Sequence, residues 1–202
     1  MAEFTAKDVA ALRQKTGAGM MDCKDALSET GGDEEKALEL LKVKMGKKLG
    51  KLAAREAAEG TVQSYIHATG KVGVLVEVDC NTDFVARNED FIAFAKDVAM
   101  HVAASPTVKY VNVEDVPQDE KDAELRVFVQ QAEAEGKPEN IREKIATGKL
   151  NKWLEEIVLV KQVHVNADKH ESKTIEQIRE QLSVTTGENV VVRRFERFAV
   201  GE

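Results

Sequence analysis

The run from Val72 to Asp79 constrains the fold more than any other stretch, because valine occupies every second position in it. An alternation with a period of two places successive side chains on opposite faces, so this run predicts a half-buried β-strand. Residues 62–67 alternate in the same way, and Thr69-Gly70 between the two runs supplies a turn. The two runs therefore predict a β-hairpin.

Residues 81–88 join the second strand to a helix that is predicted from Asn88 to about Ala104. An aromatic residue, Phe84, stands among polar residues at this junction. The pattern favours a small hydrophobic anchor that folds back onto the chain, and a projecting wedge is the alternative. Because loops on a rigid scaffold often carry function, the junction is a candidate site under either interpretation.

The first 55 residues predict a compact unit of three short helices. Thr5 and Asp8 have the spacing of a capping box at the start of the first helix. Glycines at positions 17 and 19 break that helix, and a second one follows from Met20 to about Glu29. Asp33 caps a third helix, whose leucines recur three or four residues apart. A bundle of this size is feasible as a separate unit.

Two adjacent methionines, Met20 and Met21, follow the glycine turn directly. Adjacent residues on a helix cannot both face the same core. Either one methionine is exposed as an adaptable contact residue, or both pack partly, and the pattern leaves both interpretations open.

Basic residues dominate the segment 42–55, which has no acidic residue between Glu39 and Glu56. Such a segment could contact RNA or an acidic protein face. A solvated helix face that serves as a linker is the favoured interpretation, because no aromatic residues are interleaved for base stacking.

The second half of the chain predicts more helices and one closing strand. Two helices separated by Gly136-Lys137-Pro138 form a helical hairpin at about 117–157. A short helix begins at the capping box of Thr174 and Gln177, and residues 189–200 form the last strand. The sequence therefore predicts an α+β fold. A three-helix bundle precedes a core in which helices and a helical hairpin pack on a small antiparallel sheet.

Composition narrows the class of protein. The chain has 202 residues and a formal net charge of −7, which argues mildly against nucleic acid as a direct partner. It contains no apolar run long enough for a membrane span, and its start lacks the features of a signal peptide. We therefore expect a cytoplasmic protein. Cys23 and Cys80 are far apart without metal-ligand spacing, so we expect two core residues.

Motifs for catalysis or metal binding fail when they are tested residue by residue. The run Asp79-x-Asn81-x-Asp83 matches the first half of a calcium loop, but Phe84 and Asp90 stand where glycine and glutamate are required. His67 has no second ligand or nucleophile near it, so a solvated residue is the usual interpretation. No phosphate-binding loop or nucleophile elbow is found. We expect no catalytic residue, no bound metal, no cofactor and no enzymatic activity.

Four segments resemble the elongation factor Ts family, in the family's own order. They are Thr16–Lys24 with Ala26-Leu27, Val78–Ala86, Gly136-Lys137-Pro138 with residues 141–152, and Arg197–Glu202. Members of this family are guanine nucleotide exchange factors for elongation factor Tu, the GTPase that delivers aminoacyl-tRNA to the ribosome. The resemblance implies that the chain binds the GDP-bound and nucleotide-free forms of that GTPase.

The resemblance also implies roles for individual residues. Thr82, Asp83, Phe84 and Val85 match the segment that dislodges the partner's magnesium ion, with Phe84 as a wedge. Met20 and Met21 match positions of the ubiquitin-associated-like bundle that contact the partner's nucleotide domain. His67 matches a further position at the partner surface. The resemblance thus reverses the preference that the local pattern gave for Phe84.

The chain resembles the short form of the family, with one strand-hairpin unit. We expect a ubiquitin-associated-like bundle with its linker helix at 1–55, a core domain at 56–202, and a homodimer that binds two partner molecules. One alternative is a ubiquitin-associated-type adaptor that binds proteins without exchange activity. A metal-dependent enzyme using Asp79, Asn81 and Asp83, or RNA binding through residues 42–55, agrees less well with the sequence.

Overall fold

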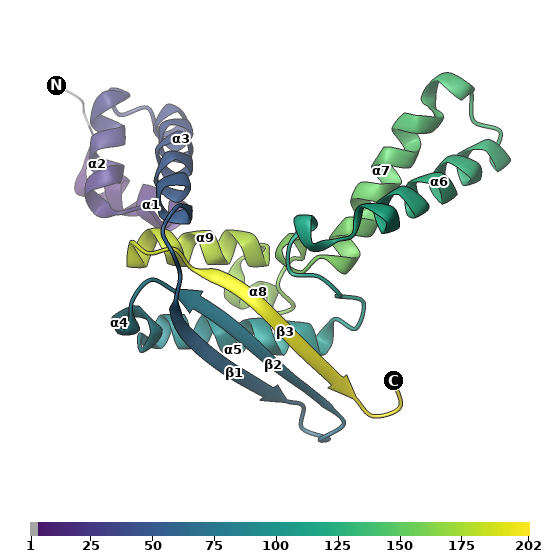
Figure 1. The fold of residues 1–202 in the computed structure, drawn as a ribbon. Helices are drawn as coiled ribbons and strands as arrows, with labels where there is room; N and C mark the ends of the chain where they lie inside the picture. The colour runs from purple at the N-terminus through teal and green to yellow at the C-terminus, as the bar shows by residue number, and fades with distance from the viewer. Residues whose placement is uncertain (1–3) are drawn as a thin grey trace. The chain divides into compact units, whose positions relative to one another are not determined.

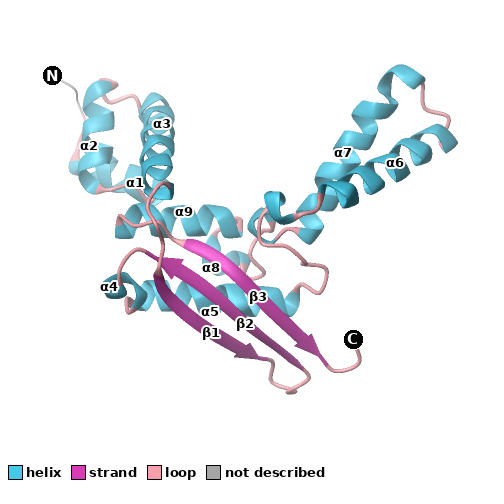
Figure 2. Ribbon diagram, viewed as in Figure 1, coloured by secondary structure: helices cyan, strands magenta, loops and turns pink. Residues whose placement is uncertain are grey.

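The computed structural model describes residues 4–202, which form helices and one sheet (Figure 1, Figure 2). The α-helices are α1 (Ala6–Thr16), α2 (Met20–Glu29), α3 (Glu34–Ala53), α4 (Asp83–Ala86), α5 (Glu89–Ala104), α6 (Gln118–Ala134), α7 (Glu139–Ile157), α8 (Ala167–His170) and α9 (Ile175–Thr186). Two short 3-10 helices are η1 (Val113–Asp115) and η2 (Leu159–Lys161), and the strands are β1 (Glu59–Ile66), β2 (Val72–Cys80) and β3 (Val191–Ala199). The predicted α+β fold is confirmed.

The chain forms two compact units that interleave in the sequence. The first contains the described residues up to Val62 together with Glu77–Ala95 and Gln177–Val192. The second contains Gln63–Val76, Lys96–Glu176 and Arg193–Glu202. The predicted boundary near residue 55 lies in the segment between α3 and β1, but the two units do not divide there, so that boundary remains a prediction.

The first three helices form the bundle that their capping residues predict. The Thr5 backbone N–H donates to Asp8 Oδ2 at 2.6 Å, and the Asp8 N–H donates to Thr5 Oγ1 at 3.4 Å, which completes the capping box. Gly17 ends α1 in the left-handed region at φ 68°, where glycine has no steric penalty. The bundle core contains Val9, Leu12, Ala18, Cys23, Ala26, Leu27, Ala37 and Leu41, all buried.

The sheet has the order β1-β2-β3, so the valine-rich strand is central, and it is antiparallel (Figure 2). Val74 and Val76 on this strand are each 1% exposed, whereas Leu75 between them is 49% exposed. The predicted half-buried strand is thus confirmed. The His67 N–H donates to the Val72 carbonyl at 2.9 Å, and this bond closes the predicted hairpin. The Val200 N–H donates to the Lys71 carbonyl at 2.9 Å, which continues the pairing of β2 with β3.

The long helix α5 is apolar on most of its surface, as the sequence predicts. Its start at Glu89 lies one residue after the predicted one. Five of its side chains have no exposed surface, and they are Phe91, Ala95, Val98, Ala99 and Val102. Burial on this scale is typical of a helix that contributes to the core of its domain.

Helices α6 and α7 form the predicted helical hairpin within the second unit. Gly136 takes a left-handed conformation at φ 70°, and the Lys137 N–H donates back to the Ala132 carbonyl at 3.0 Å. Arg142 pairs with Glu133 at 3.0 Å across the two helices. At the base of the hairpin, Leu154, Ile157 and Val158 form a buried cluster with Val116, against which Tyr110, Val113, Leu150, Trp153 and Val160 pack.

Candidate functional site

The junction after β2 contains a helical turn of its own, α4, which the sequence pattern did not predict. The Thr82 side chain caps this turn by accepting a hydrogen bond from the Val85 N–H at 3.4 Å. Asn88 then accepts from the Asp90 N–H at 2.8 Å as α5 begins. A threonine followed by an acidic residue is the usual signature of a helix start, and at Thr82-Asp83 it could have revealed this turn.

Phe84 projects from α4, and 83% of its surface is exposed. The interpretation of Phe84 as an anchor folded back onto the chain is therefore wrong. A fully buried phenylalanine side chain contributes about 1.5–3 kcal/mol relative to an exposed one, and Phe84 gains almost none of this within the chain. An exposed aromatic residue on an ordered turn is a typical anchor for another protein.

The neighbours of Phe84 are polar or half-buried. Asp83 Oδ2 pairs with Arg87 Nη2 at 3.1 Å across one helical turn. Such an exposed pair contributes little stability, so the Asp83 carboxylate is available to a cation on an approaching partner. Val85 is half-buried and Thr82 points into the protein through hydrogen bonds to Glu188. Only Phe84 offers a large apolar surface here.

Glu188, which follows α9, holds the start of this turn. Its Oε2 accepts from the backbone N–H groups of Asn81 at 3.0 Å and Thr82 at 3.1 Å. Its Oε1 accepts from the Thr82 hydroxyl at 2.6 Å. A carboxylate that accepts three hydrogen bonds from two adjacent residues fixes their backbone more firmly than neutral acceptors would.

Two asparagines extend this network around the junction. Asn81 Oδ1 accepts from the Asn189 N–H at 2.9 Å, and Asn81 Nδ2 donates to the Glu56 carbonyl at 2.6 Å. Asn189 Nδ2 donates to the Arg55 carbonyl at 2.9 Å. We call these residues, Arg55, Glu56, Asn81, Thr82, Glu188 and Asn189, the junction network. It ties three distant segments of the chain together at the start of the turn that bears Phe84.

The junction also contains Cys80, whose thiol donates to the Thr82 carbonyl at 3.2 Å. Burial, and after it the nearby Glu188 carboxylate, raises the pKa of this thiol to about 11. The thiolate is therefore scarce at neutral pH, and Cys80 is unsuited to nucleophilic chemistry. Its place in the fold is that of a small core residue, as the sequence analysis expects.

Both methionines of the bundle are exposed. Met20 is 48% and Met21 64% exposed at the start of α2, so neither is a core residue. Met20 also lines a shallow hollow with Arg13 and Gln181. Flexible thioether side chains on a surface are typical of adaptable protein contacts.

His67 belongs to the second unit, whereas Met20, Met21 and residues 82–85 belong to the first. It is exposed at the end of β1, and its Nδ1 lies 3.3 Å from the Tyr65 hydroxyl. The structure thus shows an accessible side chain here and leaves its partner role a prediction.

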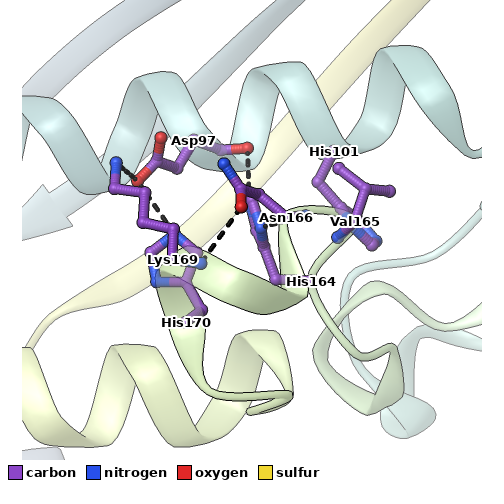
Figure 3. A network of polar contacts seen from close by, with 7 residues as sticks. All are labelled: Asp97, His101, His164, Val165, Asn166, Lys169 and His170. Atoms are coloured by element: carbon purple, nitrogen blue, oxygen red, sulfur yellow. Dashed lines mark hydrogen bonds and ion pairs between the residues drawn. The ribbon is translucent and has the colours of Figure 1, made fainter.

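A second polar network lies in the other unit and involves the remaining histidines (Figure 3). His164 Nε2 donates to the Asp97 carbonyl at 3.0 Å, and its Nδ1 accepts from the Asn166 N–H at 3.0 Å. His101 Nδ1 accepts from the Val165 N–H at 3.1 Å. An imidazole nitrogen can accept a hydrogen bond only when it carries no proton, so the two Nδ1 atoms act here as acceptors for backbone N–H groups.

Asp97 completes this network. Its Oδ2 pairs with Lys169 Nζ at 2.6 Å and lies 3.1 Å from His170 Nε2. We call Asp97, His101, His164, Asn166, Lys169 and His170 the histidine network. Across residues 4–202, no group of three or more histidine, cysteine, aspartate or glutamate side chains has the arrangement of a metal site. The histidine network fastens residues 162–170 to α5, and it was missed because its two parts lie far apart in the sequence.

No helix within residues 4–202 is both long and apolar enough to cross a membrane. The fold and the junction together define a class of α+β protein that presents an exposed aromatic anchor on an ordered turn, as protein-binding surfaces do. The model of the family "Elongation factor TS" matches residues 2–202. The chain therefore belongs to the elongation factor Ts family of translation elongation factors.

Individual relatives agree with this assignment. The chain is 50% identical over 202 residues to elongation factor Ts of Trichodesmium erythraeum, which covers all of this chain and 91% of the relative. It is 51% identical over 199 residues to that of Geobacter metallireducens, covering 98% of this chain and 90% of the relative. For Syntrophobacter fumaroxidans, the identity is 49% over 199 residues, with 98% of each chain covered.

Proposed function

We propose that the chain is a guanine nucleotide exchange factor for elongation factor Tu. Membership of the elongation factor Ts family supports the partner, and the single observation that supports a wedge is the 83% exposure of Phe84 on its capped turn. In this proposal the chain makes and breaks no covalent bond, so it is not an enzyme. It acts in the cytoplasm on the GDP-bound GTPase and remains bound to the nucleotide-free form.

The proposed mechanism is thermodynamic linkage between two ligands of one GTPase. Phe84 inserts between partner side chains beside the nucleotide site, and burial of its ring supplies free energy for the distortion of that site. Asp83 lies next to it and disturbs the magnesium ion. A factor that binds the nucleotide-poor state more tightly weakens GDP binding by the same coupling free energy. GTP then rebinds because it is abundant.

Other exposed residues supply affinity in this proposal. Met20 and Met21 contact the nucleotide-binding domain of the partner, and their exposure of 48% and 64% leaves them accessible. His67 is a further contact, because it is exposed directly after the end of β1. These contacts keep the factor bound while Phe84 acts.

We further propose a homodimer that binds two GTPase molecules. The observation that supports it is an apolar hollow in the second unit, lined by Ile66, Leu75, Phe198 and Val200 among others. These four side chains are between 49% and 77% exposed. A second copy of the chain would bury such a patch, which monomeric proteins rarely leave open. Sedimentation of a Phe198→Ser variant should show a shift to monomer, and an unchanged monomer across concentrations for the parent chain contradicts the dimer.

Release of a fluorescent GDP from elongation factor Tu tests the exchange function directly. The parent chain at micromolar concentration should accelerate release. Phe84→Ala should lower the maximal rate by roughly 10- to 100-fold, which corresponds to the burial free energy of the ring. Phe84→Leu, a matched control that keeps apolar bulk, should lose less. No acceleration by the parent chain would falsify the exchange function.

GDP release, combined with a binding measurement, also tests the adaptor alternative, which the exposed methionines of the bundle favour. An adaptor of the ubiquitin-associated type would bind a partner through Met20 and Met21 without any effect on nucleotide release. Binding of the GTPase measured by calorimetry, with unchanged GDP release, would support the adaptor. Loss of binding in Met20→Ala and Met21→Ala together with retained acceleration at high concentration would support the exchange factor.

A further inference from the structure

The turn that follows α9 contacts two other segments of the first unit, namely the junction after β2 and the basic segment. Gly187 takes a left-handed conformation at φ 73°, which redirects the chain so that Glu188 faces the junction. Glu188 then accepts hydrogen bonds from the Asn81 and Thr82 N–H groups and from the Thr82 hydroxyl. Among the described residues no other acceptor serves these two N–H groups, so the orientation of the turn that bears Phe84 depends on this carboxylate.

The same turn is fixed from its other side by the basic segment. Lys48 Nζ donates to the Val184 carbonyl at 3.1 Å, and Arg55 Nη1 donates to the Gly187 carbonyl at 3.1 Å. Cations at the C-terminus of α9 interact favourably with its free carbonyl groups and dipole. Glu188 is therefore held in place before any partner arrives, and part of the basic segment is engaged in the fold rather than solvated.

We propose that Glu188 is a positioning residue for nucleotide exchange. It holds residues 81–82 in one conformation, so that Phe84 meets the GTPase as a preformed wedge. This proposal rests on the exchange function proposed above. A preformed contact loses less conformational freedom on binding than a mobile one, so more of the burial free energy of the ring is available to distort the partner.

The shape of the network predicts how the substitutions differ. Glu188→Ala removes the acceptor of all three hydrogen bonds. Glu188→Gln keeps one side-chain oxygen for the two N–H groups and turns an amide toward the Thr82 hydroxyl, which can accept from it. Exchange should therefore fall further in the alanine variant than in the glutamine variant. Glu155→Ala, which removes an exposed carboxylate from α7, is the matched control and should leave exchange unchanged.

The decisive experiment is a double-mutant cycle on the complete chain with Glu188→Ala and Phe84→Ala. Maximal GDP release from the GTPase and the concentration for half-maximal release are measured for both single variants and the double variant. We expect Glu188→Ala to lower the maximal rate about tenfold and to change the half-maximal concentration less. We expect the double variant to release GDP at the rate of Phe84→Ala alone, because Glu188 acts through Phe84.

A structural readout accompanies the cycle. Amide hydrogen exchange should accelerate at Asn81 and Thr82 in Glu188→Ala, while amides of the α1–α3 bundle core stay protected. If Glu188→Ala does not fold, the same cycle is run with Glu188→Gln. Additive effects of the two substitutions, or an unchanged rate in Glu188→Ala, overturn the positioning role alone. A parent chain that fails to accelerate release overturns the exchange function and this role together, and the amide measurement then still reports whether Glu188 holds the turn.

Discussion

The junction network and the histidine network have the same structural role but use different hydrogen-bond acceptors. Each ties an irregular segment to regular structure by supplying acceptors for backbone N–H groups that have no partner in a helix or sheet. In the junction network the acceptor is the Glu188 carboxylate, at the start of the turn that bears the exposed Phe84. In the histidine network the acceptors are the Nδ1 atoms of His101 and His164, residues that are 1% and 2% exposed.

The difference teaches which network serves function and which serves the fold. The junction network holds a turn whose largest side chain, Phe84, faces solvent. Loss of this network should therefore alter the interaction of the surface with a partner. The histidine network anchors a surface segment through two buried rings, those of His101 and His164, so its loss should alter stability. It should also respond to pH near neutrality, because only imidazoles among its acceptors gain a proton there.

The largest effect on stability should come from His164→Ala. The substitution removes the acceptor of the Asn166 N–H and the donor to the Asp97 carbonyl, and it leaves a cavity where a side chain that is 2% exposed had packed. We expect the free energy of unfolding to fall by about 2–4 kcal/mol, from the unsatisfied groups and the lost packing.

The control for this prediction is function in the folded protein. Urea denaturation measures the stability loss, and GDP release is then measured at a temperature where the variant is fully folded. The maximal exchange rate should equal that of the parent chain. A folded His164→Ala variant that exchanges as slowly as Phe84→Ala would break the separation of the two networks.

The next effect is a loss of stability in mild acid. Burial lowers the pKa of His101 below its usual 6.5, against the hydrogen bond to Gln162, and His164 nearby lowers it further. Burial also lowers the pKa of His170. The neighbouring His164 and Lys169 lower this pKa further, whereas Asp97 raises it. Unfolded histidines thus take up protons at a higher pH than folded ones. The stability that these groups contribute is present above about pH 6.5 and is lost as the pH falls below it.

Urea denaturation between pH 8 and pH 5 measures this loss. The free energy of unfolding should decline below pH 6.5 by at most about 1.4 kcal/mol per pH unit for each of the two histidines. His170→Gln should flatten the decline, and His67→Gln, which removes an exposed histidine, should not. A free energy of unfolding that stays constant or rises toward pH 5 contradicts the lowered pKa values of His101 and His170.

Local patterns predicted the regular elements because each pattern is confined to neighbouring residues. Thr5 with Asp8 marked the start of α1, and the alternating valines marked β2, since caps and periodicity need no information from the rest of the chain. The orientation of Phe84 could not be read in this way. An aromatic residue in a polar turn is compatible with burial or exposure until its surroundings are known.

The residues that hold the junction could not be predicted either. Glu188 lies 106 positions from Thr82 in the sequence, and nothing around it differs from an ordinary polar turn. The histidines had the same obstacle, since His164 meets α5 only through the fold. The resemblance to a family indicated residues 82–85, Met20, Met21 and His67 as contacts, whereas the carboxylate that holds Thr82 emerged from hydrogen bonds between distant segments.

The smallest effect on stability should come from Lys48, whose ammonium group binds a carbonyl near the C-terminus of α9. Lys48→Met removes the hydrogen bond to the Val184 carbonyl and the charge near the C-terminus of α9, but it keeps most of the side-chain length. We expect the free energy of unfolding to fall by about 0.3–1 kcal/mol in low salt, and by less in 1 M salt, because an exposed charge near a helix end is screened. Lys51→Met, an exposed lysine on the same helix, is the control and should change stability by less. If both substitutions cost the same, the basic segment acts only through its total charge. If Lys48→Met alone is costly and also slows GDP release, the fixed position of the turn after α9 contributes to exchange as well as to the fold.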